Sequence, residues 1–142
     1  MFIVRPIQNK EEQKSIVEQC GGVYLPEALA YAAYDCADDG KTVRSLLGVC
    51  QFSLERGFGS IGLLRYAPGT CDTEAIMIMG RAAMSFLFRC GFARAVWNDD
   101  APTGFAEALG FRADADGIRA IDLARFFESP CHFRPDAPEG KQ

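Results

Sequence analysis

Residues 66–84 read YAPGTCDTEAIMIMGRAAM, and they join the end of a predicted strand to the start of a predicted helix. The chain turns at Pro68 and Gly69, two residue types that favour turns. Backbone N–H groups at a helix start attract anions, and phosphate sites often lie at strand-to-helix turns of this kind. Here, however, the carboxylates of Asp72 and Glu74 stand in the first turn of the helix. The stretch therefore predicts a helix start at which a phosphate meets two negative charges.

The helix that follows is predicted to span residues 72–90, with Gly91 as its left-handed C-terminal residue. Its polar positions Arg81, Ser85 and Arg89 form one narrow stripe, and apolar residues fill most of the remaining surface. Such a helix is expected to be buried on nearly all sides. Because monomers rarely expose large apolar patches, either the rest of the chain or a second subunit must cover it, and we expect a homodimer.

Strands and helices alternate along the rest of the chain. We expect strands at 2–4 (with Ile7), 30–35, 45–54, 60–67, 93–98 and 118–123, and helices at 9–20, 72–90 and 99–109. Short turns separate the three strands between 30 and 67, so these strands are expected to form an antiparallel meander. Asn9 predicts the cap of the first helix, and Pro102 fits the first turn of the third. The order β-α-β-β-β-α-β-α-β predicts an α/β (α+β) fold in which two helices connect neighbouring strands.

The chain has 142 residues, of which 49% are hydrophobic and 24% charged, and this composition predicts one soluble domain. We expect the domain to span residues 1–127, and residues 128–142 to form a flexible tail, because they have little to bury. The net charge of −4 and the pI near 5.0 argue against a nucleic-acid partner, which requires a basic face. No apolar run is long enough for a membrane span and no signal-peptide pattern is seen, so we expect a cytoplasmic protein without a membrane partner.

The six cysteines stand far apart, without a CxxC pair: Cys20, Cys36, Cys50, Cys71, Cys90 and Cys131. Neither a redox motif nor a zinc site is indicated, and we expect buried free thiols. His132 is the single histidine and has no nearby carboxylate, so we expect no metal site.

Residues 98–112, NDDAPTGFAEALGFR, follow a short predicted strand. Together with the element order, this stretch resembles the GNAT superfamily of acyl-CoA-dependent N-acyltransferases. Asn98, the short helix and the Leu-Gly-Phe ending at 109–111 carry the resemblance, and Arg5-Pro6 and Pro68 also match. The resemblance covers about residues 2–124. It implies a mixed central sheet with helices on both faces, acetyl-CoA or another acyl-CoA as the acyl donor, and an amine as the acceptor.

The resemblance also implies where an acyl-CoA binds. Strands 60–67 and 93–98 are implied to splay apart, and the pantetheine arm is implied to pair with the first of them, at Leu64 and Tyr66. Asn98 either bonds a pantetheine amide or only closes a turn. The pyrophosphate is implied to rest on the helix start, which contains Cys71, Thr73, Glu74, Ala75 and Ile76.

The sequence departs from the family pattern at this helix start. The pattern reads Arg or Gln, x, x, Gly, x, Gly or Ala, whereas its three defined positions here are Cys71, Glu74 and Ile76. Glycine lets the backbone approach the phosphates and arginine supplies a countercharge, so we expect weak or lost binding. Ala106 stands where many family members place a tyrosine that protonates the leaving thiolate. We expect either an atypical acyltransferase or one that no longer catalyses, with a non-catalytic GNAT-fold binding or assembly module as the alternative.

Few residues are available to replace the missing groups. Tyr66 faces the implied cleft, where its phenol either protonates a thiolate or packs. Asp99 either deprotonates an amine or caps the next helix. Cys71 is a candidate nucleophile, but the neighbouring carboxylates oppose thiolate formation, so we expect an inert thiol. The resemblance implies that the segment 21–29, GGVYLPEAL, lines the acceptor side, and because this segment is short we expect either an open acceptor site or no site.

Overall fold

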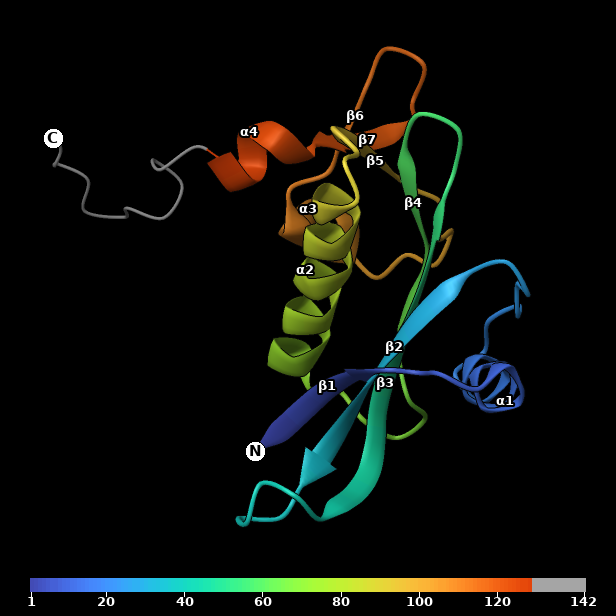
Figure 1. Ribbon diagram of the computed structural model, residues 1–142, viewed down its shortest axis with the longest axis vertical. Coiled ribbons are helices and arrows are strands. Elements are labelled where there is room, and N and C mark those ends of the chain that lie inside the picture. The colour runs from blue at the N-terminus through green and yellow to red at the C-terminus, as the bar shows by residue number, and fades with distance from the viewer. Residues whose placement is uncertain (129–142) are drawn as a thin grey trace, which may run out of the picture.

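A seven-stranded sheet organises the chain (Figure 1). The computed structural model describes residues 1–128, with strands in the order β1-β2-β3-β4-β5-β7-β6. The strands are β1 Phe2–Pro6, β2 Leu29–Cys36, β3 Val43–Leu54, β4 Gly59–Tyr66, β5 Arg94–Trp97, β6 Arg112–Ala113 and β7 Arg119–Asp122. The helices are α1 Lys10–Gln19, α2 Thr73–Arg89, α3 Phe105–Leu109 and α4 Leu123–Glu128. Figure 1 shows α1 on one side of the sheet and α2 with α3 on the other.

The sheet is mixed, as predicted. β1 to β4 are antiparallel neighbours, so the predicted meander of β2, β3 and β4 is confirmed. β4 and β5 are parallel neighbours, and α2 connects them. A parallel pair needs a crossover of this length, whereas the meander needs only turns. The local patterns of the chain therefore determine the order of its central strands.

β4 and β5 pair over only a short distance. The paired positions are Gly59 with Ala95, Ser60 with Val96 and Ile61 with Trp97. Gly62 is an extra residue in β4, because Gln51 of β3 pairs with Leu63 while Phe52 pairs with Ile61. A bulge bends its strand and increases the local twist. The predicted separation of the two strands therefore begins at Gly62.

α2 follows its predicted bounds closely. The Asp72 side chain accepts a hydrogen bond from Ala75 N–H at 3.1 Å, and Gly91 has a φ of 97° just past the C-cap. The helix packs on the strands β1 to β5 and on α3 and α4. The expectation that it is buried on nearly all sides is wrong, because these contacts cover one side and leave the Ile78 residue 44% exposed. The homodimer stays a prediction.

α3 is shorter than predicted. It begins at Phe105 instead of residue 99, and Gly104 before it has a φ of 79°. Pro102 restricts Ala101 to extended backbone, which is one reason why the helix does not start earlier. Asp99 therefore does not cap α3, and the alternative reading of Asp99 as a helix cap is wrong.

The C-terminal part adds elements that we did not predict. β6 pairs with β7, and the strand expected at 118–123 is shorter because Leu123 begins α4. The Leu123 N–H donates to the Ala93 carbonyl at 2.8 Å, which ties α4 to the start of β5. Glu128, the first residue of the predicted tail, is the last residue of α4. The domain boundary at 127 stays a prediction, and the rest of the predicted tail, 129–142 with Cys131 and His132, lies outside the described residues.

The described cysteines are free thiols, as predicted, but they are not all buried. Cys20, Cys36 and Cys50 are buried, whereas Cys71 and Cys90 are exposed at the two ends of α2. Burial raises the pKa of Cys20 to about 11, although the Arg65 charge opposes it. This thiol stays protonated near neutral pH.

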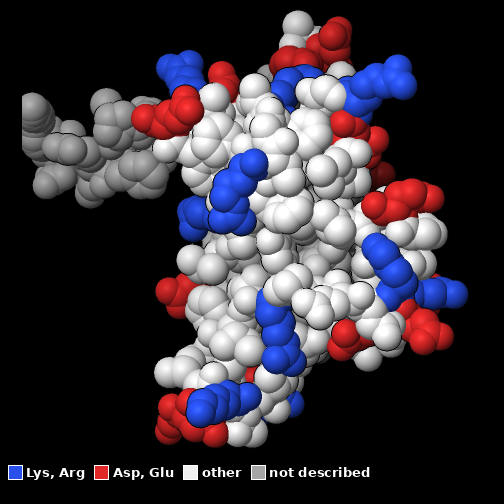
Figure 2. Space-filling model, viewed as in Figure 1, with Lys and Arg blue, Asp and Glu red and all other residues white. Residues whose placement is uncertain are grey.

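Charges of both signs are interspersed on the face shown in Figure 2. Among residues 1–128, no helix is long and apolar enough to cross a membrane. Within the same residues, no group of three His, Cys, Asp or Glu side chains could hold a metal ion. The expectations of a cytoplasmic location and of no nucleic-acid or membrane partner stay predictions.

Replacing Gly48 with alanine should destabilise the fold. A Cβ at this position of β3 would collide with the Ile76 side chain and would lie 2.5 Å from the Arg65 carbonyl oxygen. Overpacking of this kind typically costs about 1–3 kcal/mol. Gly62→Ala is the matched control, because its Cβ would meet only the Gln51 carbonyl oxygen, at 3.7 Å. Urea unfolding measures both free energies, and equal values for the two variants would contradict the tight packing of α2 on β3.

Candidate functional site

The separation of β4 from β5 leaves backbone groups of β4 without a neighbouring strand. Ala67 N–H donates to the Leu47 carbonyl at 2.9 Å, on the β3 side. Because directions alternate along an antiparallel ladder, the N–H groups of Leu64 and Tyr66 point to the β5 side. Among the hydrogen bonds outside the strand ladders, none within the described residues uses the Tyr66 N–H. These are the two positions at which the family resemblance implies the pantetheine arm, and this assignment stays a prediction.

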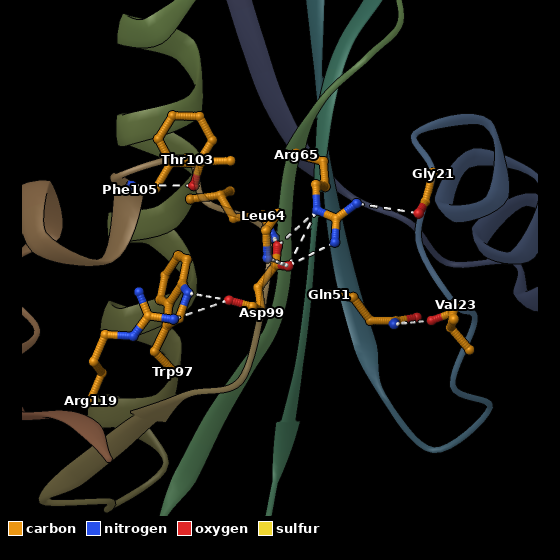
Figure 3. A network of polar contacts seen from close by, with 11 residues as sticks. Gly21, Val23, Gln51, Leu64, Arg65, Trp97, Asp99, Thr103, Phe105 and Arg119 are labelled. Atoms are coloured by element: carbon orange, nitrogen blue, oxygen red, sulfur yellow. Dashed lines mark hydrogen bonds and ion pairs between the residues drawn. The ribbon is translucent and has the colours of Figure 1, made fainter. Parts of the chain in front are cut away.

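The Leu64 N–H is bound by a side chain from the loop after β5. It donates to Asp99 Oδ2 at 2.9 Å. Arg65 binds the same carboxylate through two nitrogens, with Nη2 to Oδ1 at 2.8 Å and Nε to Oδ2 at 3.0 Å. Ala101 N–H adds a bond to Oδ1 at 3.1 Å. Figure 3 shows this carboxylate between β4 and its own loop, and the residue is 2% exposed.

These contacts set the charge of Asp99. Burial raises the pKa of its carboxyl group, but the hydrogen bonds from Arg65, Leu64 and Ala101 outweigh burial, so the pKa lies below its ordinary value. The bond to Asp99 in turn raises the pKa of Arg65. A general base needs a free lone pair and a pKa near the working pH. The role of Asp99 as a base stays a prediction, and its surroundings disfavour that role.

The main chain of Asp99 is held as firmly as its side chain. Its carbonyl accepts from Trp97 Nε1 at 3.1 Å and from Arg119 Nη2 at 3.3 Å (Figure 3). Arg65 Nη1 donates onward to the Gly21 carbonyl at 3.2 Å. The network therefore joins β4, the β5–α3 loop, β7 and the loop after α1.

Two buried glutamines extend the hydrogen-bond network on the α1 side of the sheet. Gln51 Nε2 donates to the Val23 carbonyl at 2.9 Å, while its Oε1 accepts from Gln13 Nε2 at 3.0 Å and from Leu25 N–H at 3.2 Å. Both glutamines are 1% exposed, and buried amides of this kind need partners. The loop after α1 is thus fixed to β3.

Tyr66 is the last residue of β4, and its side chain reaches the first residue of α2. Its hydroxyl oxygen is 2.7 Å from Thr73 Oγ1, and its ring packs edge-on against Phe105 with centroids 5.2 Å apart. The Tyr66 ring therefore packs, as the alternative interpretation of this residue expects. The role of the phenol as an acid stays a prediction. Ala106, in the position of the family tyrosine, is buried.

Some of the backbone N–H groups at the start of α2 are already hydrogen-bonded to Asp72. Asp72 accepts from Ala75 N–H with its side chain and from Ile76 N–H with its carbonyl, at 3.1 and 3.2 Å. No hydrogen bond within the described residues uses the N–H groups of Thr73 and Glu74, and both residues are exposed, as is Cys71. Two of the five predicted phosphate-binding positions are thus already engaged through their backbone.

Asn98 closes the last step between β4 and β5. Its N–H donates to the Ile61 carbonyl at 2.8 Å, and its Nδ2 donates to Ser60 Oγ at 2.6 Å. Both contacts tie Asn98 to β4, so the two alternatives, closing of a turn and binding of a pantetheine amide, stay predictions.

A pocket of about 210 Å³ opens near the network. Its lining comes from the loop after α1, from β3 and β4, and from the loop after β5: Gly21, Gly22, Val23, Leu25, Gln51, Gly62, Leu63, Arg65, Asn98, Asp99 and Asp100. The predicted acceptor segment contributes Gly21, Gly22, Val23 and Leu25 to this wall. Arg65 and Gln51 were not predicted from the sequence as site residues. An arginine within an apolar strand could have indicated Arg65, because a half-buried cation needs a partner.

Comparisons with solved structures identify the fold. A GNAT-family acetyltransferase from Brucella melitensis, solved with acetyl-CoA, is 17% identical, with a TM-score of 0.59 over 86% of this chain and 88% of that one. A GNAT-family N-acetyltransferase from Escherichia coli, solved with CoA, is 12% identical, with a TM-score of 0.61 over 87% and 82%. The ribosomal-protein-S18-alanine N-acetyltransferase from Escherichia coli is 10% identical, with a TM-score of 0.61 over 87% and 94%.

No protein-family model and no curated protein sequence matches the chain. The likeness therefore rests on structure at low sequence identity, and what it establishes is the fold. The protein has the fold of the GNAT acetyltransferases, as the sequence predicted.

Asp99→Asn should destabilise the protein in a pH-dependent way. Removing one partner of a buried ion pair costs about 3 kcal/mol, or less here because the Arg65 side chain is 26% exposed. The folded pKa of Asp99 is lowered, so its contribution is complete above the unfolded pKa of about 3.9 and is lost as the pH falls through the folded value. The difference between wild type and variant should therefore shrink below about pH 4.

Asp35→Asn is the control for this measurement. Asp35 pairs with Arg44 at 3.6 Å on the surface, where such pairs contribute about 0–1 kcal/mol. Urea unfolding at neutral and acidic pH measures both variants. An Asp99→Asn loss no larger than that of Asp35→Asn would show that the network does not stabilise the fold.

Proposed function

We propose that the protein is an atypical GNAT-fold N-acyltransferase, with an acyl-CoA between β4 and β5 and an amine acceptor in the pocket near Arg65. The observation that carries this proposal is the backbone edge of β4 beyond Gly62, where the Tyr66 N–H faces the side from which β5 has separated. The GNAT-family neighbours solved with acetyl-CoA and with CoA support it.

An acyl-CoA would supply a thioester whose acyl carbon bonds to the amine nitrogen while the C–S bond breaks. The Tyr66 N–H would hold the donor along β4. The Tyr66 hydroxyl, 2.7 Å from Thr73 Oγ1, is the group available to give a proton to the leaving thiolate. The proton that the amine loses would go to water, because Arg65 already neutralises Asp99.

With Tyr66 as the acid and water as the proton acceptor, we expect slow acyl transfer. General acids and bases contribute roughly 10²–10⁴-fold in rate when they are well placed. Ala106 has no acidic proton, and the pKa of Asp99 is lowered, away from the range of an efficient base. The protein should therefore acylate amines well below ordinary enzymatic rates.

The second candidate function is a non-catalytic binding or assembly module. One observation favours it: Asp99 already occupies the Leu64 N–H, so part of the β4 edge is satisfied within the chain. Stabilisation against heat separates the two functions, because a ligand at a hundred times its dissociation constant adds about 2.7 kcal/mol of stability. Stabilisation by acetyl-CoA supports the acyltransferase, and its absence supports the module.

The carboxylates at the start of α2 should weaken acyl-CoA binding. A like charge about 4 Å from the pyrophosphate costs on the order of 4 kcal/mol at an effective dielectric of 20, and solvent reduces this for exposed groups. Asp72→Asn with Glu74→Gln removes both charges and keeps a capping residue, since Asn caps as well as Asp. We expect wild type to bind CoA weakly in calorimetry and this double variant to bind at least tenfold more tightly.

Glu11→Gln with Glu18→Gln is the control, because it removes the same charge from α1. It should leave CoA binding at the wild-type value. Tight wild-type binding that the α2 variant does not change would mean that these carboxylates do not face the ligand.

Tyr66→Phe should lower acyl transfer at least tenfold, because it removes the proposed acid and keeps the ring against Phe105. Release of free CoA thiol in the presence of a panel of amines measures the rate. Tyr31→Phe is the matched control, since Tyr31 packs on Phe52 in β3. Ordinary enzymatic rates that Tyr66→Phe leaves unchanged would contradict this account of the site.

A further inference from the structure

The Asp99 carboxylate occupies a position on β4 that an extended ligand would need. Beyond Gly62, Leu64 is the first residue of β4 whose N–H points to the β5 side, and Asp99 Oδ2 accepts that N–H at 2.9 Å. A carboxylate oxygen is a stronger acceptor for an N–H group than a neutral carbonyl oxygen. Any amide or thioester carbonyl that pairs with Leu64 must therefore displace Asp99.

The chain holds Asp99 at this position from several directions. The loop between β5 and α3 stays non-helical up to Gly104, so Asp99 is free to turn back toward β4. Trp97 Nε1 and Arg119 Nη2 hold its carbonyl, at 3.1 and 3.3 Å. Arg65 then compensates the buried charge through two short bonds.

A helix cap or a solvent-facing loop residue would not need this arrangement. Asp99 is 2% exposed, whereas its neighbour Asp100 is exposed and lines the same pocket. The two adjacent carboxylates thus differ in one respect that matters here: only the first is hydrogen-bonded to the β4 backbone within the described residues.

We infer that Asp99 is an internal competitor for the acyl-CoA site: it closes the β4 edge at Leu64 in the free protein, and the ligand binds only after the carboxylate has left. This inference rests on the proposed function. The apparent dissociation constant equals the intrinsic constant divided by the open fraction, so an edge that is open about 10% of the time weakens binding about tenfold. The hydrogen bond between Leu64 and Asp99 therefore acts as an autoinhibitory contact.

Calorimetric titration of CoA into two neighbouring variants tests the inference. Asp99→Ala removes the competitor and should bind CoA at least tenfold more tightly than wild type. Asp100→Ala removes an adjacent carboxylate that accepts no hydrogen bond from the β4 backbone within the described residues, and this variant should bind CoA as wild type does. The contrast between these two variants separates loss of the competitor from a general loss of negative charge.

The wild-type protein provides a second measurement, because Asp99→Ala also removes a stabilising ion pair. In nuclear magnetic resonance spectra, saturating CoA should shift the Leu64 amide and the Arg65 Nε–H signals, since both groups lose Asp99. If CoA saturates the wild type and leaves both signals in place, the inference is overturned, whether or not Asp99→Ala folds.

The outcomes also separate this inference from the proposed function. Tighter binding by Asp99→Ala alone, together with shifted signals, supports the inference. Measurable CoA binding that is equal in wild type and Asp99→Ala overturns the inference and leaves the proposed function standing. No CoA binding by either folded protein overturns the proposed function, and the inference falls with it.

Discussion

The ion pair between Arg65 and Asp99 is the interaction on which the site depends. β4 and β5 must pair at Gly59–Ile61 to close the sheet, yet they separate once the bulge at Gly62 bends β4 away. The separation leaves backbone donors that water or another group must satisfy. Asp99 supplies that group to the Leu64 N–H, and the Arg65 guanidinium offsets the cost of burying the Asp99 charge. The Asp99 carboxylate thus stabilises the sheet and is also part of the candidate site.

This sharing disfavours Asp99 as the catalytic base of the proposed acyltransferase. A carboxylate that stabilises the sheet needs a low pKa and full engagement, whereas a catalytic base needs a free lone pair and a higher pKa. Asp99 has the first set of properties. In the turn that follows the C-terminal end of β4, Asp72 has a similar double role, because it caps α2 and also places a charge where an anion would approach. Local stabilisation and ligand binding compete at both ends of the proposed site.

Much of the fold follows from short-range patterns. Asn9, which accepts from the N–H groups of Glu11 and Glu12, marks the start of α1, and Gly91 with its φ of 97° marks the end of α2. The α3 start was wrong because Pro102 and Gly104 act through backbone conformation, while the sequence pattern shows only a proline that a first turn tolerates. α4 was missed because the apolar residues at 118–127 fit a strand as well as a short helix that packs on α2.

By itself, the sequence determined the order of the elements, the meander, the α2 cap and the resemblance to the GNAT superfamily, because each depends on residues close together in the chain. Only the tertiary structure decided the role of Asp99, since Arg65 and Leu64 lie more than thirty positions away and meet it only when β4 and β5 become neighbours. The same holds for the contact of Tyr66 with Phe105 and for the burial of Gln51. A side chain whose partner comes from another strand has no local signature, because the sheet creates the contact.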